Sequence, residues 1–276
     1  MPIEDTKAPP LSSEAYAHCF LTFRKYSTEW LSMLRWCRQR LATCLPVKSP
    51  FRALSVGAGN GDFDWRLLPI LKAHISSLEY IFVEPSQAMC RRLRQRIGSQ
   101  PLHGVKFDLE SSCFETCPLE QTFNLVLLTH CLYYIPDRET AIGHASRLAG
   151  ESGSVLIFHQ TPLGIDQVQK KFIKRIKGTE QEMFTSHDIQ KILARRHTPN
   201  QLEQIESYID VSECFLRGST EGEALLSFFL ECDVRHIDPA LKREVVEYIY
   251  ALSYPDQGKR LLRHPVAVFI LSMGMS

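Results

Sequence analysis

The sequence predicts an α/β fold, an open and mostly parallel Rossmann-like sheet with helices on both faces. Between residues 51 and 160, short apolar runs alternate with stretches of helical periodicity, which is the pattern of a parallel sheet covered by helices. A glycine-rich turn follows the first of these runs. A helical segment precedes this region, and a longer stretch with looser alternation follows it.

The elements are expected in the following order. After a polar lead over residues 1–12, which we expect to be flexible, apolar side chains recur at helical spacing from Ser13 to about Leu45. The breaker cluster at residues 46–50 predicts a linker into the next unit. Strands are then expected at Arg52–Val56, Glu79–Val83, Gly104–Phe107, Phe123–Leu128 and Ser154–His159, and helices at Asp62–Ala73, Ser86–Ile97 and Arg138–Leu148.

Beyond residue 160 the strand–helix alternation loosens, which indicates an insertion over residues 161–255. The expected helices are Ile165–Ile176, Ser186–Ala194, Glu221–Glu231 and Pro239–Leu252, and the expected strands are Gln204–Val211 and Val266–Ser272. The last of these strands returns the chain to the sheet within residues 256–276.

Composition excludes several classes of protein and partner. With 44% hydrophobic and 23% charged residues over 276 positions, the chain is neither disordered nor collagen-like. Because 32 Lys and Arg face 31 Asp and Glu, we expect neither a nucleic-acid nor a membrane partner. The polar start has no signal-peptide core and no apolar run nears ~20 residues, so a cytoplasmic location is expected. Nine cysteines without a CxxC pair predict free thiols and no metal site.

The glycine turn is the first candidate binding feature. It reads Val56-Gly57-Ala58-Gly59-Asn60-Gly61, between a buried strand and a helix. Glycines at alternate positions allow a tight turn and a close backbone approach by a ligand. The N–H groups at the start of the next helix favour negative charge at the turn. Taken alone, the turn is compatible with a nucleotide, a flavin or a dinucleotide.

The end of the second predicted strand narrows the choice of ligand. It reads Val83-Glu84-Pro85-Ser86, which places a carboxylate where it would bond both hydroxyls of a ribose. The turn lacks the later glycine of the dinucleotide fingerprint and the lysine of a Walker motif. This combination resembles the class I S-adenosylmethionine-dependent methyltransferases. The resemblance implies a seven-stranded sheet and S-adenosyl-L-methionine as cofactor.

The fourth strand ends in Thr129-His130-Cys131-Leu132-Tyr133-Tyr134, where a doubly wound sheet forms its ligand crevice. The resemblance places the methyl acceptor here. Methyl transfer is an in-line displacement, so the protein mainly aligns a lone pair with the methyl group and excludes water. Aromatic faces suit this role because they tolerate sulfonium and ammonium groups.

A closer resemblance extends over most of the chain, to the histamine N-methyltransferase family. The matching segments are Tyr16, Phe20 and Phe23 followed by Ser27-Thr28-Glu29, the turn from Leu54 to Asp64, Val83–Ser86, Val105–Phe107, Cys131–Asp137, Phe184–Asp188, Asp210–Phe215 with Glu221-Gly222, and Val266–Leu271. This resemblance implies a monomer that methylates a nitrogen of a small amine. It also implies one domain, with a cap over the active site at 1–48, a cofactor-binding core at 49–160, an auxiliary substrate region at 161–255 and the last strand at 256–276.

Roles follow from the resemblance position by position. The implied cofactor-binding residues are Gly57, Ala58, Gly59, Gly61, Glu84, Pro85, Ser86, Met89, Ser112, Thr129 and His130. The implied substrate-binding residues are Tyr16, Phe20, Phe23, Glu29, Tyr133, Tyr134, Phe229 and His264. His130 and Glu29 are the expected catalytic residues. A carboxylate among aromatic side chains, as at Glu29, is what an amine site needs.

Five residues depart from the family at positions that contact the acceptor or the cofactor. His130 and His264 stand where the family has a glutamine and an asparagine, Ile165 and Gln169 replace two tryptophans, and Met89 replaces a cofactor-contacting glutamine. A histidine can donate, accept, act as a base or carry charge, so the two histidines suit either proton transfer or a substrate carboxylate.

We therefore expect a small amine, amino acid or heteroaromatic acceptor other than histamine. The alternatives are an O- or S-methyltransferase in which His130 is the general base, and a binding module of the same fold without catalysis.

Overall fold

The computed structural model describes residues 8–45, 50–178 and 183–272. The chain forms two compact units. Unit 1 contains Met1–Ser32, Gln160–Thr185 and Glu206–Val266, and unit 2 contains Met33–His159, Ser186–Ile205 and Ala267–Ser276. No helix in the described parts of the chain is long and apolar enough to cross a bilayer.

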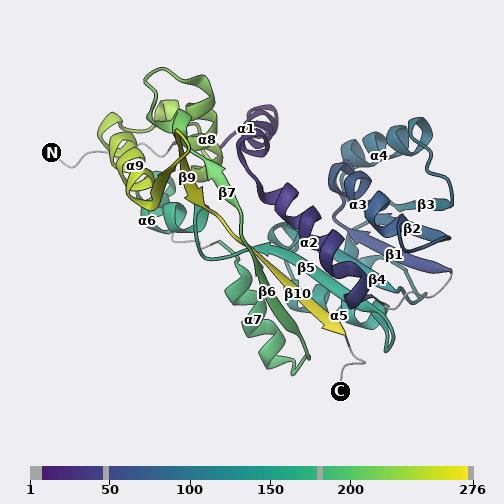
Figure 1. The fold of residues 1–276 in the computed structure, drawn as a ribbon. Coiled ribbons are helices and arrows are strands. Elements are labelled where there is room, and N and C mark those ends of the chain that lie inside the picture. The colour runs from purple at the N-terminus through teal and green to yellow at the C-terminus, as the bar shows by residue number, and fades with distance from the viewer. Residues whose placement is uncertain (1–7, 46–49, 179–182, 273–276) are drawn as a thin grey trace. The chain divides into compact units, whose positions relative to one another are not determined.

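Unit 2 is built on a seven-stranded sheet with the strand order β3-β2-β1-β4-β5-β10-β6 (Figure 1). The strands are β1 (Phe51–Val56), β2 (Leu78–Val83), β3 (Val105–Glu110), β4 (Leu125–Thr129), β5 (Ser154–Gln160), β6 (Gln201–Ile205) and β10 (Val266–Ser272). The four ladders that join β3, β2, β1, β4 and β5 are parallel, which confirms the predicted fold. Val56 lies opposite Val83, so Gly57 and Glu84 leave the sheet at the same edge.

Among the residues that the structure describes, five helices belong wholly or mostly to unit 2. They are α2 (Glu29–Cys44), which begins in unit 1, α3 (Asp62–Lys72), α4 (Gln87–Ser99), α5 (Arg138–Ala149) and α7 (Ser186–Arg195). Side-chain caps fix two of their starts, since Ser86 accepts the Met89 N–H and Asp137 accepts the Thr140 N–H. α3 and α4 lie beside β1–β3 in Figure 1. The core of the unit is made of fully buried strand residues such as Phe82, Leu128 and Phe158.

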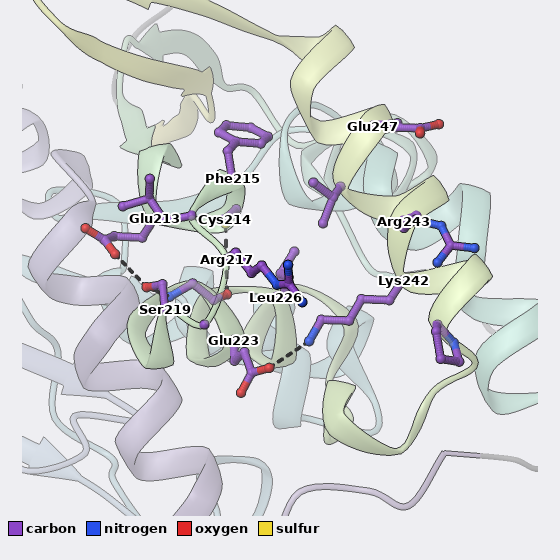
Figure 2. Close-up of a pocket in the computed structure, with 15 residues that line it drawn as sticks. Glu213, Cys214, Phe215, Arg217, Ser219, Glu223, Leu226, Lys242, Arg243 and Glu247 are labelled. Atoms are coloured by element: carbon purple, nitrogen blue, oxygen red, sulfur yellow. Dashed lines mark hydrogen bonds and ion pairs between the residues drawn. The ribbon is translucent and has the colours of Figure 1, made fainter.

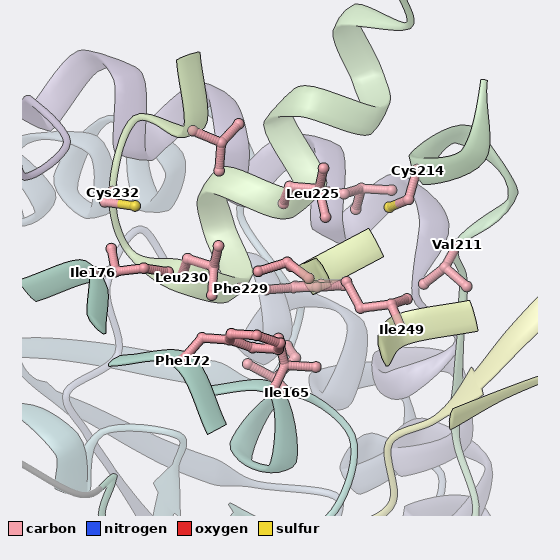
Figure 3. Close-up of a cluster of buried hydrophobic side chains, with 14 of the residues drawn as sticks. Ile165, Phe172, Ile176, Val211, Cys214, Leu225, Phe229, Leu230, Cys232 and Ile249 are labelled. Atoms are coloured by element: carbon pink, nitrogen blue, oxygen red, sulfur yellow. The ribbon is translucent and has the colours of Figure 1, made fainter. Parts of the chain in front are cut away.

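The described residues of unit 1 form four helices and a small antiparallel sheet of order β7-β9-β8. The helices are α1 (Ser13–Tyr26), α6 (Ile165–Lys177), α8 (Thr220–Leu230) and α9 (Pro239–Leu252), and the strands are β7 (Tyr208–Asp210), β8 (Ser253–Asp256) and β9 (Lys259–Arg263). The apolar stripe of α6 packs on α8, and Figure 3 shows Phe172 and Phe229 pointing toward each other. The described parts of the chain also contain four short 3₁₀ turns, two in unit 2 and two in unit 1: η1 (Phe114–Thr116), η2 (Leu132–Tyr134), η3 (Ser212–Phe215) and η4 (Val234–His236).

The predicted strand Gln204–Val211 was wrong, because two strands in different sheets occupy this segment. β6 ends at Ile205 and β7 begins at Tyr208. Buried Ser207 lies between them, accepts the His264 N–H at 2.9 Å and donates its hydroxyl to the His264 carbonyl. The chain therefore leaves one sheet for the other at this point.

The β8–β9 hairpin was not predicted. β8 contains Pro255 and three exposed residues out of four, so it has no apolar alternation. Its turn places Gln257 and Gly258 at φ values of 46° and 79°. A glycine at the second of two left-handed positions is a hairpin signal.

The N-terminal region differs from prediction in two respects. The expected continuous helical stretch is broken between α1 and α2, where the Ser27 hydroxyl accepts the Glu29 N–H. Residues 8–12 are held rather than free, since the N–H of buried Ala8 donates to the Ile176 carbonyl and Pro10 bridges to Cys232. Residues 1–7 of the predicted lead, 46–49 of the predicted linker and 273–276 at the end lie outside the described residues.

Candidate functional site

The residues expected to bind cofactor and acceptor form two clusters, one in each unit. The cofactor cluster, in unit 2, begins with the turn between β1 and α3. Gly57, Gly59 and Gly61 all have positive φ values, between 59° and 75°. A Cβ on Gly57 would lie 2.5 Å from the Cβ of Cys131, whereas a Cβ on Gly59 would meet nothing within 4 Å. The backbone at Gly59 is thus open to a ligand, as a cofactor-binding turn requires.

Glu84 closes this turn at the end of β2. The residue is only 6% exposed, and its carboxylate accepts the N–H groups of Gly59 and Ser86, each at 2.8 Å. Each carboxylate oxygen has a second lone pair, so Glu84 can hold the turn and still accept ribose hydroxyls. One side chain therefore shapes the loop and offers acceptors to the ligand.

The remaining expected cofactor residues lie on the same edge of the sheet. Ala58 is within the turn and Pro85 is exposed beside Glu84, while Ser86 and half-buried Met89 begin α4. Two further positions carry shielded hydroxyl oxygens, Ser112 after β3 and Thr129 at the end of β4. The Thr129 hydroxyl has no hydrogen-bond partner among the described residues, and an orphaned polar atom at this edge fits a polar ligand. These features fit S-adenosyl-L-methionine.

Three aromatic side chains gather where β4 and β5 end. The Nδ1 atom of His130 lies 3.3 Å from the hydroxyl of Tyr133, and the two rings are nearly parallel. The ring of Tyr133 stacks on the fully buried ring of His159 with centroids 4.2 Å apart. His130 has a φ of 49°, which is uncommon for a residue with a side chain. Tyr134, the next predicted residue, is 72% exposed.

Cys131 has a packing role rather than a chemical one at this edge of the sheet. Burial raises the pKa of its thiol to about 12, so it stays protonated near neutral pH and is a poor nucleophile. Its Cβ faces Gly57, which fixes the separation between the glycine turn and the end of β4.

The acceptor cluster, in unit 1, contains Glu29 and His264. Both residues are buried, with exposed fractions of 5% for Glu29 and 2% for His264. The His264 Nε2 lies 3.5 Å from a Glu29 carboxylate oxygen. Ser207 holds the His264 backbone from both sides. Gly164 has a φ of 66°, and a Cβ there would come within 2.8 Å of the His264 ring. The structure thus brings together two residues that stand 235 positions apart in the sequence.

A group of aromatic rings packs against His264 through Phe23. Phe23 meets the His264 ring edge-on with centroids 6.1 Å apart and stacks on Phe228 at 4.6 Å. Phe20 and Tyr16 also pack against Phe228, at 5.9 and 6.0 Å. The fourth predicted aromatic residue of unit 1, Phe229, is fully buried in the core cluster instead.

Prediction from the sequence missed His159, Phe228, Ser207 and Gly164. His159 ends a predicted strand, so the rule that drew attention to His130 would also have indicated it. Phe228 adjoins Phe229 on one helix, and only the helical phase decides which of the two faces α1. No local signal indicates Ser207 or Gly164, whose roles depend on a distant histidine.

A pocket of about 450 Å³ lies elsewhere in unit 1, between η3, the start of α8, and α9 (Figure 2). Three acidic and three basic side chains line it, and the Lys242 amine reaches across to Glu223 at 2.8 Å. It shares no residue with either cluster, so it is not the predicted site.

Comparison with known proteins agrees with the cofactor cluster. The family model called Methyltransferase domain matches residues 54–155, which contain the glycine turn, Glu84 and Thr129–Tyr134. Histamine N-methyltransferase A of Xenopus laevis is 26% identical over 261 residues, covering 88% of this chain and 89% of the relative. Carnosine N-methyltransferase 2 of Gallus gallus is 25% identical over 234 residues, covering 79% and 73%.

Solved structures agree with the fold. A putative methyltransferase from Bacillus halodurans superposes with a TM-score of 0.56 at 12% identity, covering 86% of this chain and 98% of that one. A putative sarcosine dimethylglycine methyltransferase from Galdieria sulphuraria gives 0.54 at 11% identity, with 95% and 99% covered.

The strand order, the glycine turn with its buried acid and the matched domain define a class I S-adenosylmethionine-dependent methyltransferase. The cofactor is S-adenosyl-L-methionine. Within that class the chain resembles histamine N-methyltransferase over most of its length, at an identity that does not establish the acceptor.

Proposed function

We propose that the enzyme methylates a nitrogen atom of a small amine, amino acid or heteroaromatic metabolite. The observation that carries this proposal is the buried Glu29 carboxylate, set beside His264, whose ring meets Phe23 edge-on. A carboxylate in such surroundings favours a cationic or hydrogen-bond-donating nitrogen group. The relatives named for histamine and carnosine methylation support the same acceptor class.

The residues of unit 2 hold the cofactor in this proposal. The backbone of Gly57–Gly61 receives its methionine end, Glu84 accepts the ribose hydroxyls, and Ser112 lies toward the adenine. Thr129 and His130 flank it from the end of β4. The bound cofactor supplies an electrophilic methyl group on a sulfonium, so the protein's own task is to align the nitrogen lone pair and exclude water.

The residues of unit 1 recognise the acceptor in this proposal. Glu29 pairs with the polar end of the acceptor, and His264 holds the carboxylate in place from behind. Because Glu29 already has this partner, an acceptor must share or displace that contact. We therefore propose an acceptor other than histamine itself, in keeping with the His264 and His130 departures from the family.

An O- or S-methyltransferase is the second candidate, and the contact between His130 and Tyr133 is what favours it. A phenol or thiol must lose a proton to become a good nucleophile, and an imidazole beside the methyl group can accept it. The variant His130→Gln distinguishes the two candidate functions. It should abolish methylation of phenols or thiols, whereas a tertiary amine, which has no proton to lose on methylation, should retain a substantial rate.

Two pairs of variants test the proposal. Calorimetric titration with S-adenosylhomocysteine should show that Glu84→Ala weakens binding by at least about 30-fold, because two charge-assisted hydrogen bonds are lost. Glu79→Ala, near the opposite end of the same strand, is its matched control and should bind normally.

A radiometric methyl-transfer screen over histamine, carnosine, primary amines, imidazoles, amino acids, phenols and thiols identifies the acceptor. For the best amine, Glu29→Gln should raise KM about 10-fold or more and leave the affinity for S-adenosylhomocysteine unchanged, whereas exposed Glu14→Gln should do neither. Loss of both affinities in Glu29→Gln would refute the division of roles. Unimpaired cofactor binding in Glu84→Ala would refute the cofactor assignment.

A further inference from the structure

Three side chains near the ends of β4 and β5 contact one another in turn. His130 contacts Tyr133, and Tyr133 stacks on His159, while the His130 and His159 ring centroids lie 6.3 Å apart. All three belong to unit 2 and stand at the edge of the sheet that carries the cofactor cluster. His159 is fully buried, so its ring gives Tyr133 a rigid surface to stack on.

The backbone also constrains His130. Its φ of 49° lies in the left-handed region, where a side chain costs about 1 kcal/mol or more. Its N–H donates to the Phe158 carbonyl at 3.0 Å, which ties it to the strand that carries His159. Such a conformation persists only where the surrounding contacts enforce it, and it fixes the direction in which the imidazole leaves the chain.

We propose that Tyr133 is a positioning residue that sets the tautomer of His130, and that His159 holds the Tyr133 ring in place for this purpose. The proposal rests on the proposed N-methyltransferase function and adds to it that His130 receives the proton released by the acceptor. The Tyr133 hydroxyl accepts a hydrogen bond from the His130 Nδ1–H. The other ring nitrogen, Nε2, which is shielded from solvent, then has the lone pair that a base needs.

The proposed step is balanced in atoms and charge. The nitrogen lone pair forms a bond to the methyl carbon, the carbon–sulfur bond breaks, and its electron pair stays on sulfur. A nitrogen that began with a hydrogen becomes a methylated ammonium, and its proton passes to His130 Nε2. The imidazolium that results keeps its Nδ1–H on Tyr133, whose hydroxyl oxygen stabilises the charge.

This arrangement specifies the kind of acceptor. Nitrogens that carry a hydrogen to be lost, such as those of primary and secondary amines, benefit from a base held in this way. A tertiary amine or a pyridine nitrogen becomes a quaternary cation without releasing a proton and gains nothing from it. The Tyr133 hydroxyl should therefore matter for the first group only.

Two measurements on the full chain test the proposal. The first is ¹⁵N and ¹³C NMR of ring-labelled histidine, with the His130 signals assigned by their disappearance in His130→Gln. Wild-type His130 should be mainly the Nδ1–H tautomer, and Tyr133→Phe, which keeps the ring on His159, should shift it by at least twofold toward the Nε2–H form that free imidazole side chains prefer. Tyr134→Phe, the neighbouring change, should leave the tautomer unaltered.

The second measurement is the kinetics of methyl transfer to the best primary amine and to its tertiary analogue. Tyr133→Phe should lower kcat for the primary amine about 10-fold or more while KM and the affinity for S-adenosylhomocysteine stay within twofold. Exposed Tyr250→Phe on α9 is the matched control and should be as active as the wild type.

A failure of this positioning role can be distinguished from a failure of the proposed function. An Nε2–H tautomer in the wild type, or an identical tautomer in Tyr133→Phe, overturns the positioning role whatever the activity. Equal kcat for the primary amine in Tyr133→Phe and wild type overturns it as well. If no nitrogen acceptor is methylated the proposed function fails, and the NMR measurement still decides whether Tyr133 sets the tautomer of His130.

Discussion

At the scale of single residues, the acid side chains of this enzyme have distinct surroundings. Glu84 is buried but satisfied by two backbone N–H groups, and Glu29 is buried beside a histidine. A third buried acid, Asp64, lies in the first turn of α3 beneath the glycine turn and accepts the Tyr80 hydroxyl at 2.7 Å. Burial raises the pKa of Asp64, while hydrogen bonds from Ser55 and Tyr80 oppose the rise.

The raised pKa predicts how Asp64 affects stability. The folded protein holds this proton more tightly than the unfolded chain does, so the free energy of unfolding falls as the pH rises from about 4 through the raised folded value. Asp64→Asn keeps an acceptor oxygen and removes the titration. The Tm of the variant relative to wild type should therefore increase between pH 4 and pH 8, as followed by circular dichroism.

The control for this series is Asp256→Asn, an exposed change in the β8–β9 hairpin. Its Tm difference from wild type should stay flat over the same range. Parallel curves for Asp64→Asn and wild type would show that the buried carboxyl does not carry the predicted linkage.

At the scale of elements, the sequence was sufficient wherever local pattern and tertiary structure coincide. The glycines directly follow the apolar run of β1, and the acid directly follows that of β2, so the sheet and the cofactor edge could be predicted from local sequence. The β6–β7 break and the β8–β9 hairpin could not, because pairing with distant segments sets them. The Glu29–His264 contact joins a helix start to the approach of the last strand, and no local pattern encodes it.

Substitutions at two glycines, one in the β1–α3 turn and one at the end of α4, give a prediction at the scale of elements. Gly57→Ala should lower the Tm and weaken S-adenosylhomocysteine binding by at least about 10-fold, because its Cβ would meet Cys131 and its φ is 62°. Gly98→Ala, in the last turn of α4, has open space and an ordinary φ. It should leave binding unchanged and raise stability by up to about 1 kcal/mol.

Thermal melts and calorimetric titrations of both variants make the comparison. Normal binding in Gly57→Ala would mean that the β1–α3 turn can move away from Cys131, which contradicts the fixed spacing described for the cofactor edge.

At the scale of the whole molecule, each unit has its own core, and each core contains fully buried phenylalanines. Phe229 lies in the unit 1 cluster, and Phe158 lies on β5 in unit 2 against Trp36 and Phe63. Either Phe→Ala change should cost about 3–5 kcal/mol. Phe229→Ala should produce an early melting step while the affinity for S-adenosylhomocysteine is retained.

Phe158→Ala should instead weaken the binding of S-adenosylhomocysteine together with stability. Differential scanning calorimetry with and without this ligand distinguishes the cases, since the ligand should raise only the transition of unit 2. A single transition and an equal loss of affinity in both variants would contradict independent cores.

The path of the chain through the two units has a consequence for synthesis. The chain changes units after Ser32, His159, Thr185, Ile205 and Val266, so each unit is assembled from three separate segments. Strand β10, which lies between β5 and β6, is the last element of the sheet to leave the ribosome. Until it does, β6 has no neighbour in the sheet, and β5 presents an unpaired edge. Nascent chains of this enzyme should therefore depend on chaperones late in translation, and neither unit can be obtained as a continuous fragment.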